Sequence, residues 1–113
     1  MRVLRRDGTP CIVREEDILY FSSHQNTIYV HTAEGEFVYP ISLSELHAAY
    51  GPVGYERYDR SNVVNTEQVA SYDSDRKVAQ FLNAASSYAT VSEPNEGKLL
   101  RLLKQRKEKG TGL

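Results

Sequence analysis

The sequence is poor in the residues that stabilise small proteins by covalent chemistry. Its 113 residues contain one cysteine, one methionine and no tryptophan. Because Cys11 is alone, no disulfide can form within the chain, which suits a reducing cytoplasm. No apolar run approaches the roughly 20 residues that span a bilayer, and no apolar stretch follows Arg2, Arg5 and Arg6, so no signal peptide is predicted. We therefore expect a cytoplasmic protein with no membrane partner.

Patterns for metal binding and catalysis are also missing. His24 and His31 have no neighbours at the spacing of a closed zinc site. No glycine-rich phosphate loop is present, and Asp73-Ser74-Asp75 lacks the glycine and the downstream glutamate of a calcium loop. We therefore predict no enzyme, no metal, no cofactor and no small-molecule substrate.

Charge is nearly balanced over the whole chain but is segregated along it. The net charge is -1, made up of -6 over residues 1–97 and +5 over residues 98–113. Binding of an anionic partner depends on the local field rather than on the sum, so the balance does not exclude nucleic acid. The basic excess begins within a helix predicted at Glu96–Lys109, and residues 105–113 are predicted to be a flexible basic tail.

The predicted fold is mainly β, in one domain, with short antiparallel strands, one short capped helix and a C-terminal helix. Alternating or apolar runs bounded by turn residues indicate the strands. They are expected at residues 11–13, 18–21, 27–32, 36–39, 55–60, 69–72, 77–82 and 88–92. Residues 1–9 are expected to be a lead-in before the first strand.

The clearest helix signal lies at Ser42–Gly51. Ser42 and Glu45 form a capping box, and Gly51 is placed to end the helix. Three apolar side chains recur on one face, so the helix is expected to cover one side of the sheet: Leu43, Leu46 and Tyr50.

The stretch Tyr55–Val69 is the most informative part of the chain. A polar triplet, Arg60-Ser61-Asn62, separates an alternating aromatic and charged strand from the apolar pair Val63-Val64. The triplet has side chains that bind phosphate oxygens or base edges, which predicts a rigidly presented contact loop. The alternative is that Arg60 only pairs with Asp59 or Glu56 on the surface and has no role in binding.

A second polar loop precedes the strand at residues 27–32. It contains His24, Gln25 and Asn26, whose side chains are all competent to contact base edges. Polar residues are equally what any exposed loop contains, so the composition of this loop leaves its function open.

These stretches together resemble the LytTR family of bacterial DNA-binding domains. The resemblance is carried by Tyr55-x-Arg57-x-x-Arg60-Ser61-x-Val63-Val64-Asn65-x-x-x-Val69. Supporting blocks occur in the expected order at residues 17–21, 29–32, 42–46, 78–81 and 89–92. The resemblance covers residues 10–104 and implies small antiparallel sheets that project loops into the DNA groove.

The function implied by the resemblance is sequence-specific binding of double-stranded DNA and transcription regulation. It implies two copies on a direct repeat, with self-association possible, and a response regulator output domain or a stand-alone regulator. It also implies that Asn26 and Ser92 lie near base edges and that Lys77, Tyr88 and Thr90 lie near the backbone. With the polar loops, the predicted DNA-binding residues are His24, Gln25, Asn26, Arg57, Arg60, Ser61, Asn62, Lys77, Tyr88, Thr90 and Ser92.

The chain departs from the family pattern at three positions. Asp59 stands where histidine is common, Asn62 where tyrosine or phenylalanine is usual, and Glu93 where a basic residue is frequent. Because a carboxylate near phosphate repels it, an alternative function is a LytTR-like protein-interaction module that has lost DNA binding.

Overall fold

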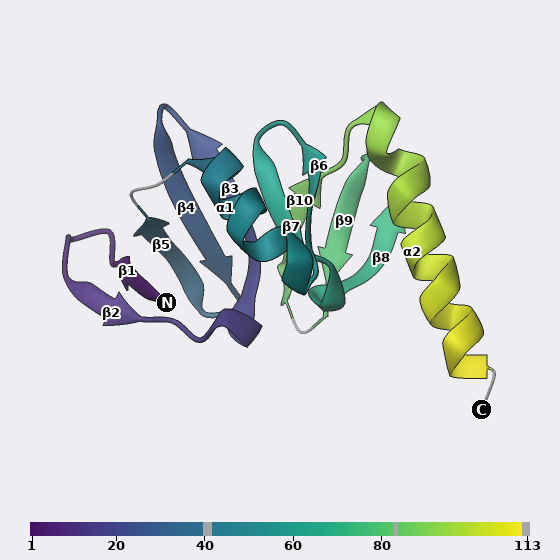
Figure 1. Cartoon of the computed structure of the whole chain (residues 1–113), viewed down its shortest axis with the longest axis horizontal. Coiled ribbons are helices and arrows are strands. Elements are labelled where there is room, and N and C mark those ends of the chain that lie inside the picture. Colours follow the sequence, from purple (N-terminus) through teal and green to yellow (C-terminus); the bar gives the residue numbers. More distant parts are fainter. Residues whose placement is uncertain (40–41, 83, 112–113) are drawn as a thin grey trace.

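The computed structural model describes residues 1–39, 42–82 and 84–111, with the side chains of residues 85 and 108–111 left out of the description. Two antiparallel sheets and two α-helices make up this part of the chain (Figure 1). The prediction of a mainly β fold with two helices is confirmed.

The larger sheet has seven strands in the order β2-β1-β5-β4-β3-β7-β6. All of its pairings are antiparallel, and most of its neighbours are joined by short turns. Its strands are β1 (Arg2–Leu4), β2 (Pro10–Ile12), β3 (Ile18–His24), β4 (Thr27–Thr32), β5 (Gly35–Tyr39), β6 (Tyr55–Asp59) and β7 (Asn62–Asn65).

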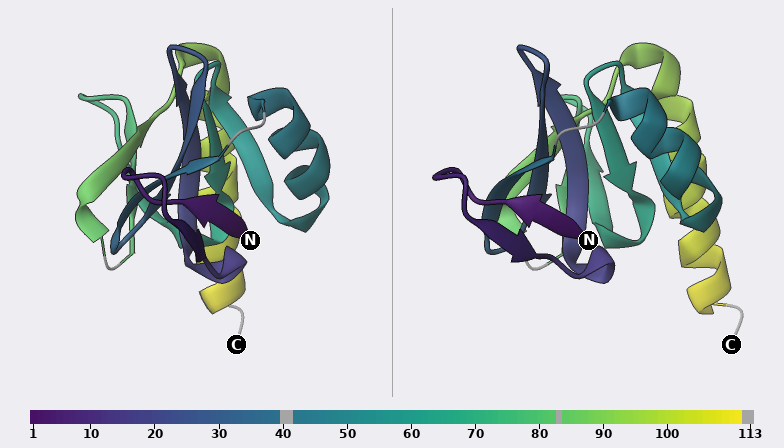
Figure 2. Two further views of the ribbon diagram at one scale, coloured as in Figure 1. Left: turned by 90° about the vertical axis from the view of Figure 1, so that its left-hand side faces the viewer. Right: turned by 60° about the vertical axis from the view of Figure 1, so that its left-hand side comes forward.

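The smaller sheet has three strands in the order β10-β9-β8. They are β8 (Val69–Asp73), β9 (Val78–Phe81) and β10 (Ala84–Thr90). The helices are α1 (Leu43–Tyr50) and α2 (Glu93–Thr111), and three short 3₁₀ turns are η1 (Glu15–Asp17), η2 (Gly51–Val53) and η3 (Thr66–Gln68). Figure 2 shows α1 on one face of the larger sheet and α2 running alongside the far end of the molecule.

Two features of the chain differ from the sequence prediction. The predicted lead-in contains a strand, because β1 pairs with both β2 and β5 and buries Val3 in the core. The helix α1 ends at Tyr50, but Gly51 keeps a right-handed conformation and continues into η2. The left-handed residue that ends this helical stretch is Gly54, at φ 100°. Glycine is favoured there because other residues adopt positive φ at a cost.

A bulge in β3 lets one apolar run supply two cores. The pairing of β3 with β4 shifts between Ile18 and Tyr20, so Leu19 is an extra residue in β3. A bulge changes the alternation of side chains along a strand. As a result Ile18 and Phe21 lie in one core, whereas Leu19 and Tyr20 lie in the other.

The two cores occupy opposite faces of the larger sheet. The first lies under α1 and contains Phe21, Leu46 and Val63. The second lies between strands β3, β6 and β7, the smaller sheet and α2, and contains Val64 and Leu99. Because β3 and β7 contribute to both, the middle of the larger sheet is packed on both sides.

The C-terminal helix is longer and better anchored than the sequence predicts. It begins at Glu93 and runs to Thr111, three residues before and two residues beyond the predicted helix Glu96–Lys109. Residues 112–113 of the predicted tail lie outside the described residues. The Arg106 guanidinium donates to the carbonyl of Val69 at 2.5 Å and also to the carbonyl of Thr66. This contact ties the end of α2 to the loop between the two sheets.

Candidate nucleic-acid interface

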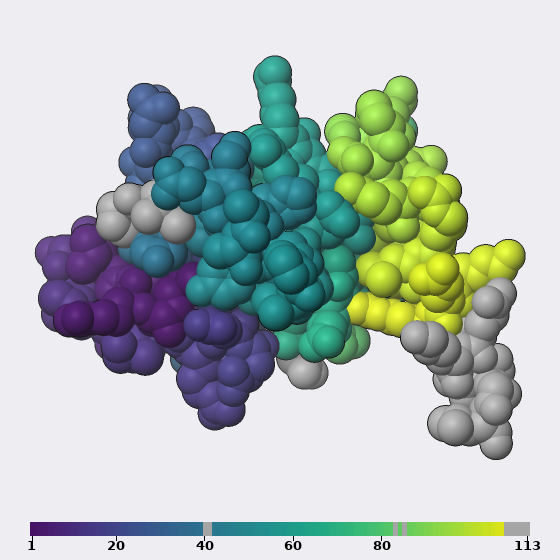
Figure 3. All heavy atoms as spheres, in the orientation of Figure 1, coloured from purple at the N-terminus to yellow at the C-terminus, as the bar shows by residue number. Residues whose placement is uncertain are grey.

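Four loops from both sheets lie along one edge of the molecule (Figure 1). They are the β3–β4 turn, the β6–β7 turn, the β8–β9 loop and the junction of β10 with α2. Most of the predicted DNA-binding residues belong to these loops, although they are far apart in the sequence. In the space-filling view this edge is uneven, and the β6–β7 segment projects beyond its neighbours (Figure 3).

The β3–β4 turn presents two polar side chains in a fixed conformation. His24 pairs with Thr27, which leaves Gln25 and Asn26 as the two turn residues. Their φ angles are 50° and 64°, and two successive positive φ angles define a type I′ turn. Asparagine tolerates this conformation better than most residues. The turn therefore holds Gln25 and Asn26 at the exposed end of the hairpin.

The β6–β7 hairpin contains a bulge that Asn62 stabilises. The pairing of β6 with β7 shifts between Glu56 and Asp59. The Asn62 side-chain oxygen accepts from the backbone N–H groups of Tyr58 and Asp59 at 3.3 and 3.1 Å. Its amide nitrogen donates to the Thr90 carbonyl at 2.7 Å. Asn62 is only 2% exposed. This predicted DNA-binding residue is therefore buried, and its side chain is not available to DNA.

The tip of the same hairpin is stabilised by two charged side chains. Asp59 accepts from the Arg60 backbone N–H at 2.8 Å and from the Thr90 hydroxyl at 2.7 Å. The Arg57 guanidinium donates to the Arg60 carbonyl at 2.5 Å. The two hydrogen bonds that Asp59 accepts come from a backbone N–H group and a hydroxyl, so its carboxylate is used within the fold.

Arg60 itself is exposed, and its guanidinium makes no hydrogen bond or ion pair with any residue that the structure describes. The surface pair with Asp59 is therefore not formed. Ser61 lies beside it with a part-buried hydroxyl, 3.4 Å from the Asp59 carboxylate. The hairpin thus presents an unpaired planar cation on a backbone that several hydrogen bonds hold still.

The loops are joined to each other by hydrogen bonds. The Ser23 N–H donates to the Ser61 carbonyl at 3.0 Å, which links the first two loops. The Ser92 N–H and hydroxyl both donate to the Tyr58 carbonyl, at 2.8 and 3.2 Å, which links the start of α2 to β6. Ser92 is therefore an anchoring residue at the edge, with its hydroxyl already used. Such cross-links hold the row of loops in one arrangement.

Lys77 and Tyr88 lie near this edge with other partners. Lys77 forms ion pairs with Glu93 and Glu96 at the start of α2, at 3.2 and 3.9 Å. Tyr88 is exposed, with the Arg76 guanidinium 4.9 Å from the centre of its ring, and it lines a crevice with His31. Neither side chain lies on the β6–β7 hairpin that carries Arg60.

The start of α1 is a part of the edge that the sequence prediction missed. Ser42 caps α1 by accepting from the Glu45 N–H at 3.1 Å. Ser42 lines one shallow hollow together with Asn26, Arg57 and Arg60. The capping pattern could have indicated this place, because the N–H groups at the start of a helix favour anions.

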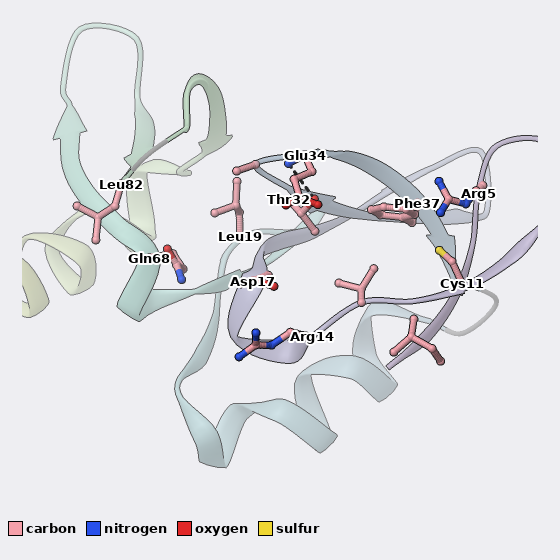
Figure 4. Close-up of a pocket in the computed structure, with 13 residues that line it drawn as sticks. Arg5, Cys11, Arg14, Asp17, Leu19, Thr32, Glu34, Phe37, Gln68 and Leu82 are labelled. Atoms are coloured by element: carbon pink, nitrogen blue, oxygen red, sulfur yellow. Dashed lines mark hydrogen bonds between the residues drawn. The ribbon is translucent and has the colours of Figure 1, made fainter.

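A different hollow, of about 520 Å³, lies at the opposite edge of the molecule. Figure 4 shows residues that line it, among them Arg14 and Asp17 at η1, Phe37 on β5, and Leu82 directly after β9. It contains none of the predicted DNA-binding residues. The candidate site is therefore the edge formed by the four polar loops, called the loop edge below, because it carries most of the predicted DNA-binding residues.

The fold and the site define a class of protein: a small antiparallel β domain that presents turns and a helix start as a row of polar contacts. The chain belongs to the LytTR family, because the family model described as "LytTr DNA-binding domain" matches residues 10–104. DNA binding and transcription regulation are the general functions of this family, which is not a family of catalytic domains.

A solved structure supports the fold. The chain is similar to the LytTr DNA-binding domain of a putative methyl-accepting/DNA response regulator from Bacillus cereus, with a TM-score of 0.74 and 21% sequence identity. The match covers 91% of this chain and 94% of that chain. No curated protein sequence is significantly similar to this chain. Among the described residues, neither helix combines the length and the apolar character that crossing a membrane requires.

Proposed function

We propose that this protein binds specific sequences in double-stranded DNA through the loop edge and thereby regulates transcription. The observation that carries the proposal is the exposed, unpaired Arg60 guanidinium at the tip of a hydrogen-bonded hairpin. A planar guanidinium can bind the O6 and N7 atoms of guanine together, or grip a phosphate with two hydrogen bonds.

The neighbouring loops supply the other kinds of contact that specific binding needs. Gln25 and Asn26 carry amides that can pair with an adenine edge, and the type I′ turn holds them at the end of the hairpin. Arg57 and the start of α1 lie between these two loops, where a phosphate can be bound. Asn62 is excluded from the proposed contacts by its burial. Ser92 and Thr90 stabilise the loops instead, because their hydroxyls donate to the Tyr58 carbonyl and to the Asp59 carboxylate.

The proposal includes the biological setting. Two copies of the protein bind adjacent sites of a direct repeat. The protein acts in the bacterial cytoplasm, as the output domain of a response regulator or as a stand-alone regulator. The longest extent of the molecule is 45 Å, so one copy covers about 13 base pairs at 3.4 Å per pair. No step of catalysis and no small-molecule substrate is needed for this function.

The test is binding of a fluorescent duplex by the full chain over a series of salt concentrations. Each phosphate contact contributes a slope of about -0.9 to log K against log salt, so several contacts predict a steep fall in affinity. In vitro selection from a random duplex pool should then enrich a repeated element. A flat salt response and no enrichment would support the protein-interaction alternative instead.

A further inference from the structure

Lys77, a predicted contact to the DNA backbone, is already bound to two carboxylates of α2. Its ammonium lies 3.2 Å from Glu93 Oε1 and 3.9 Å from Glu96 Oε2. Its backbone is fixed, because it ends the β8–β9 loop at φ 56° and its carbonyl accepts from the Val91 N–H at 2.9 Å. The lysine is therefore directed at the start of α2.

The two carboxylates differ in how firmly they are held. The Tyr72 hydroxyl donates to Glu96 Oε2 at 2.5 Å, which fixes that side chain against the smaller sheet. The Glu93 side chain is 79% exposed, and Lys77 is its one ion-pair partner among the residues described. An exposed pair of this kind contributes little to stability, so it can be removed without disturbing the fold. Glu93 is thus the movable member of the pair.

The remaining charges at this end of the edge do not compensate for the two glutamates. Asp73 accepts from the backbone N–H groups of Asp75 and Arg76, and so caps the β8–β9 loop. The Arg76 guanidinium lies over the Tyr88 ring. Acidic groups therefore outnumber basic groups around the start of α2, and Lys98, the next cation along α2, is paired with Glu56 of β6 instead.

We propose that Glu93 and Glu96 compete with DNA phosphate for Lys77, so that this end of the loop edge reduces DNA affinity. This inference rests on the proposed function. A carboxylate and a phosphate both offer anionic oxygens to an ammonium, which acts as a point charge with three donors. While the pair is closed, Lys77 is neutralised and Glu93 repels the backbone. The pair stays closed on the duplex, so the α2 end lowers the affinity while the β6–β7 hairpin sets the position.

The first measurement compares the full chain with its Glu93→Gln variant on a fluorescent random-sequence 30-base-pair duplex. Glutamine keeps the size of the side chain and removes its charge. The variant should bind about fivefold more tightly, as one unit charge at close range implies. Its log–log salt slope should be steeper by about 0.9, because one more phosphate is neutralised.

The second measurement tests the coupling to Lys77. Lys77→Met should change the affinity of the parent by less than about twofold, because its charge is already neutralised by the pair. The same substitution in the Glu93→Gln background should remove most of the gain and restore the shallower salt slope. Equal costs of Lys77→Met in both backgrounds would show that Glu93 and DNA do not compete for Lys77.

The matched control is Glu67→Gln. Glu67 is an exposed carboxylate in η3, away from the loop edge, so its removal changes the net charge by the same amount. It should alter affinity by less than about twofold. If Glu67→Gln and Glu93→Gln have the same effect, only the overall charge matters and the inference fails while DNA binding stands. If no variant and no parent binds duplex at any salt concentration, the proposed function fails as well.

Discussion

Arg60 is the residue on which the proposed DNA contact depends most. Arg60→Ala should lower duplex affinity at least about tenfold, since a lost arginine contact to a base typically costs ~1–3 kcal/mol. The thermal unfolding midpoint should stay close to that of the parent, because the side chain is exposed and makes no hydrogen bond or ion pair with the described residues. Fluorescence anisotropy and calorimetry measure the two quantities.

Two further substitutions sharpen the test of Arg60. Arg60→Lys should recover only part of the affinity, because an ammonium cannot reproduce the planar fork. Arg5→Ala, which removes an exposed arginine at the opposite end of the molecule, should have little effect. If Arg60→Ala and Arg5→Ala weaken binding equally, Arg60 contributes only its charge to the overall field.

His31 is expected to make the stability of the fold depend on pH. It stacks on Tyr20 at 4.1 Å between ring centroids, and its Nε2 lies 2.8 Å from the Ser22 hydroxyl. Burial lowers the pKa of His31, and the nearby Glu36 opposes this only in part. Since the unfolded chain takes up the proton first as pH falls below about 6.5, the free energy of unfolding should decrease between pH 7.5 and pH 5.5.

Chemical denaturation at these two pH values measures the effect. His31→Gln should make the free energy of unfolding less dependent on pH, because the titrating group is gone. If the free energy of unfolding of His31→Gln decreased by the same amount between these pH values, the pH dependence would come from the carboxylates instead of His31.

At the scale of single residues, Asn62 shows where prediction from the sequence fails. A polar residue between Ser61 and Val63 suggests a contact loop, and its local pattern contains no sign of burial. Its role depends on the bulge in β6 and on Thr90, which is 28 residues further along the chain. Such a long-range partner cannot be predicted from neighbouring residues. Arg60 was predicted correctly as exposed because its environment is local.

At the scale of elements, two substitutions in the β3–β4 turn distinguish the backbone conformation of Asn26 from the contact that its side chain makes with DNA. Asn26 has φ 64°, which glycine adopts without strain and alanine does not. Asn26→Gly should therefore keep the free energy of unfolding within about 0.5 kcal/mol, while Asn26→Ala should lose about 1 kcal/mol. Both variants should lose base preference at one confined position, because both lack the amide.

The measurement uses a duplex recovered by in vitro selection and its single-base variants. If Asn26 contacts a base, parent affinity should vary by ~1–3 kcal/mol at that position and the two variants should be indifferent there. Equal weakening on every duplex would show that the turn touches phosphate only.

The elements were predicted better where their signals are local. The boundaries of β4 and the cap of α1 agree with the sequence, because alternation and the Ser42–Glu45 pattern act over a few residues. The strand β1 was missed, since three residues held by pairing with β2 and β5 have no periodicity of their own. The anchoring of α2 was missed for a similar reason: Arg106 reaches carbonyls of a loop more than 35 residues earlier.

For the whole molecule, the two cores on opposite faces of β3 and β7 have a consequence for how the protein unfolds. Phe21 and Val63 are directly paired, and exposing their amides requires both cores to open. These amides should therefore exchange with deuterium only through global unfolding. Ile28→Val in the first core and Val69→Ala in the second should each accelerate exchange at Phe21 and Val63 in proportion to the stability lost. If each substitution accelerated exchange in its own sheet alone, the sheets would be separate folding units. The shared strands instead predict a protein that unfolds in one step, so that a destabilising substitution in either core also destabilises the row of loops along the edge.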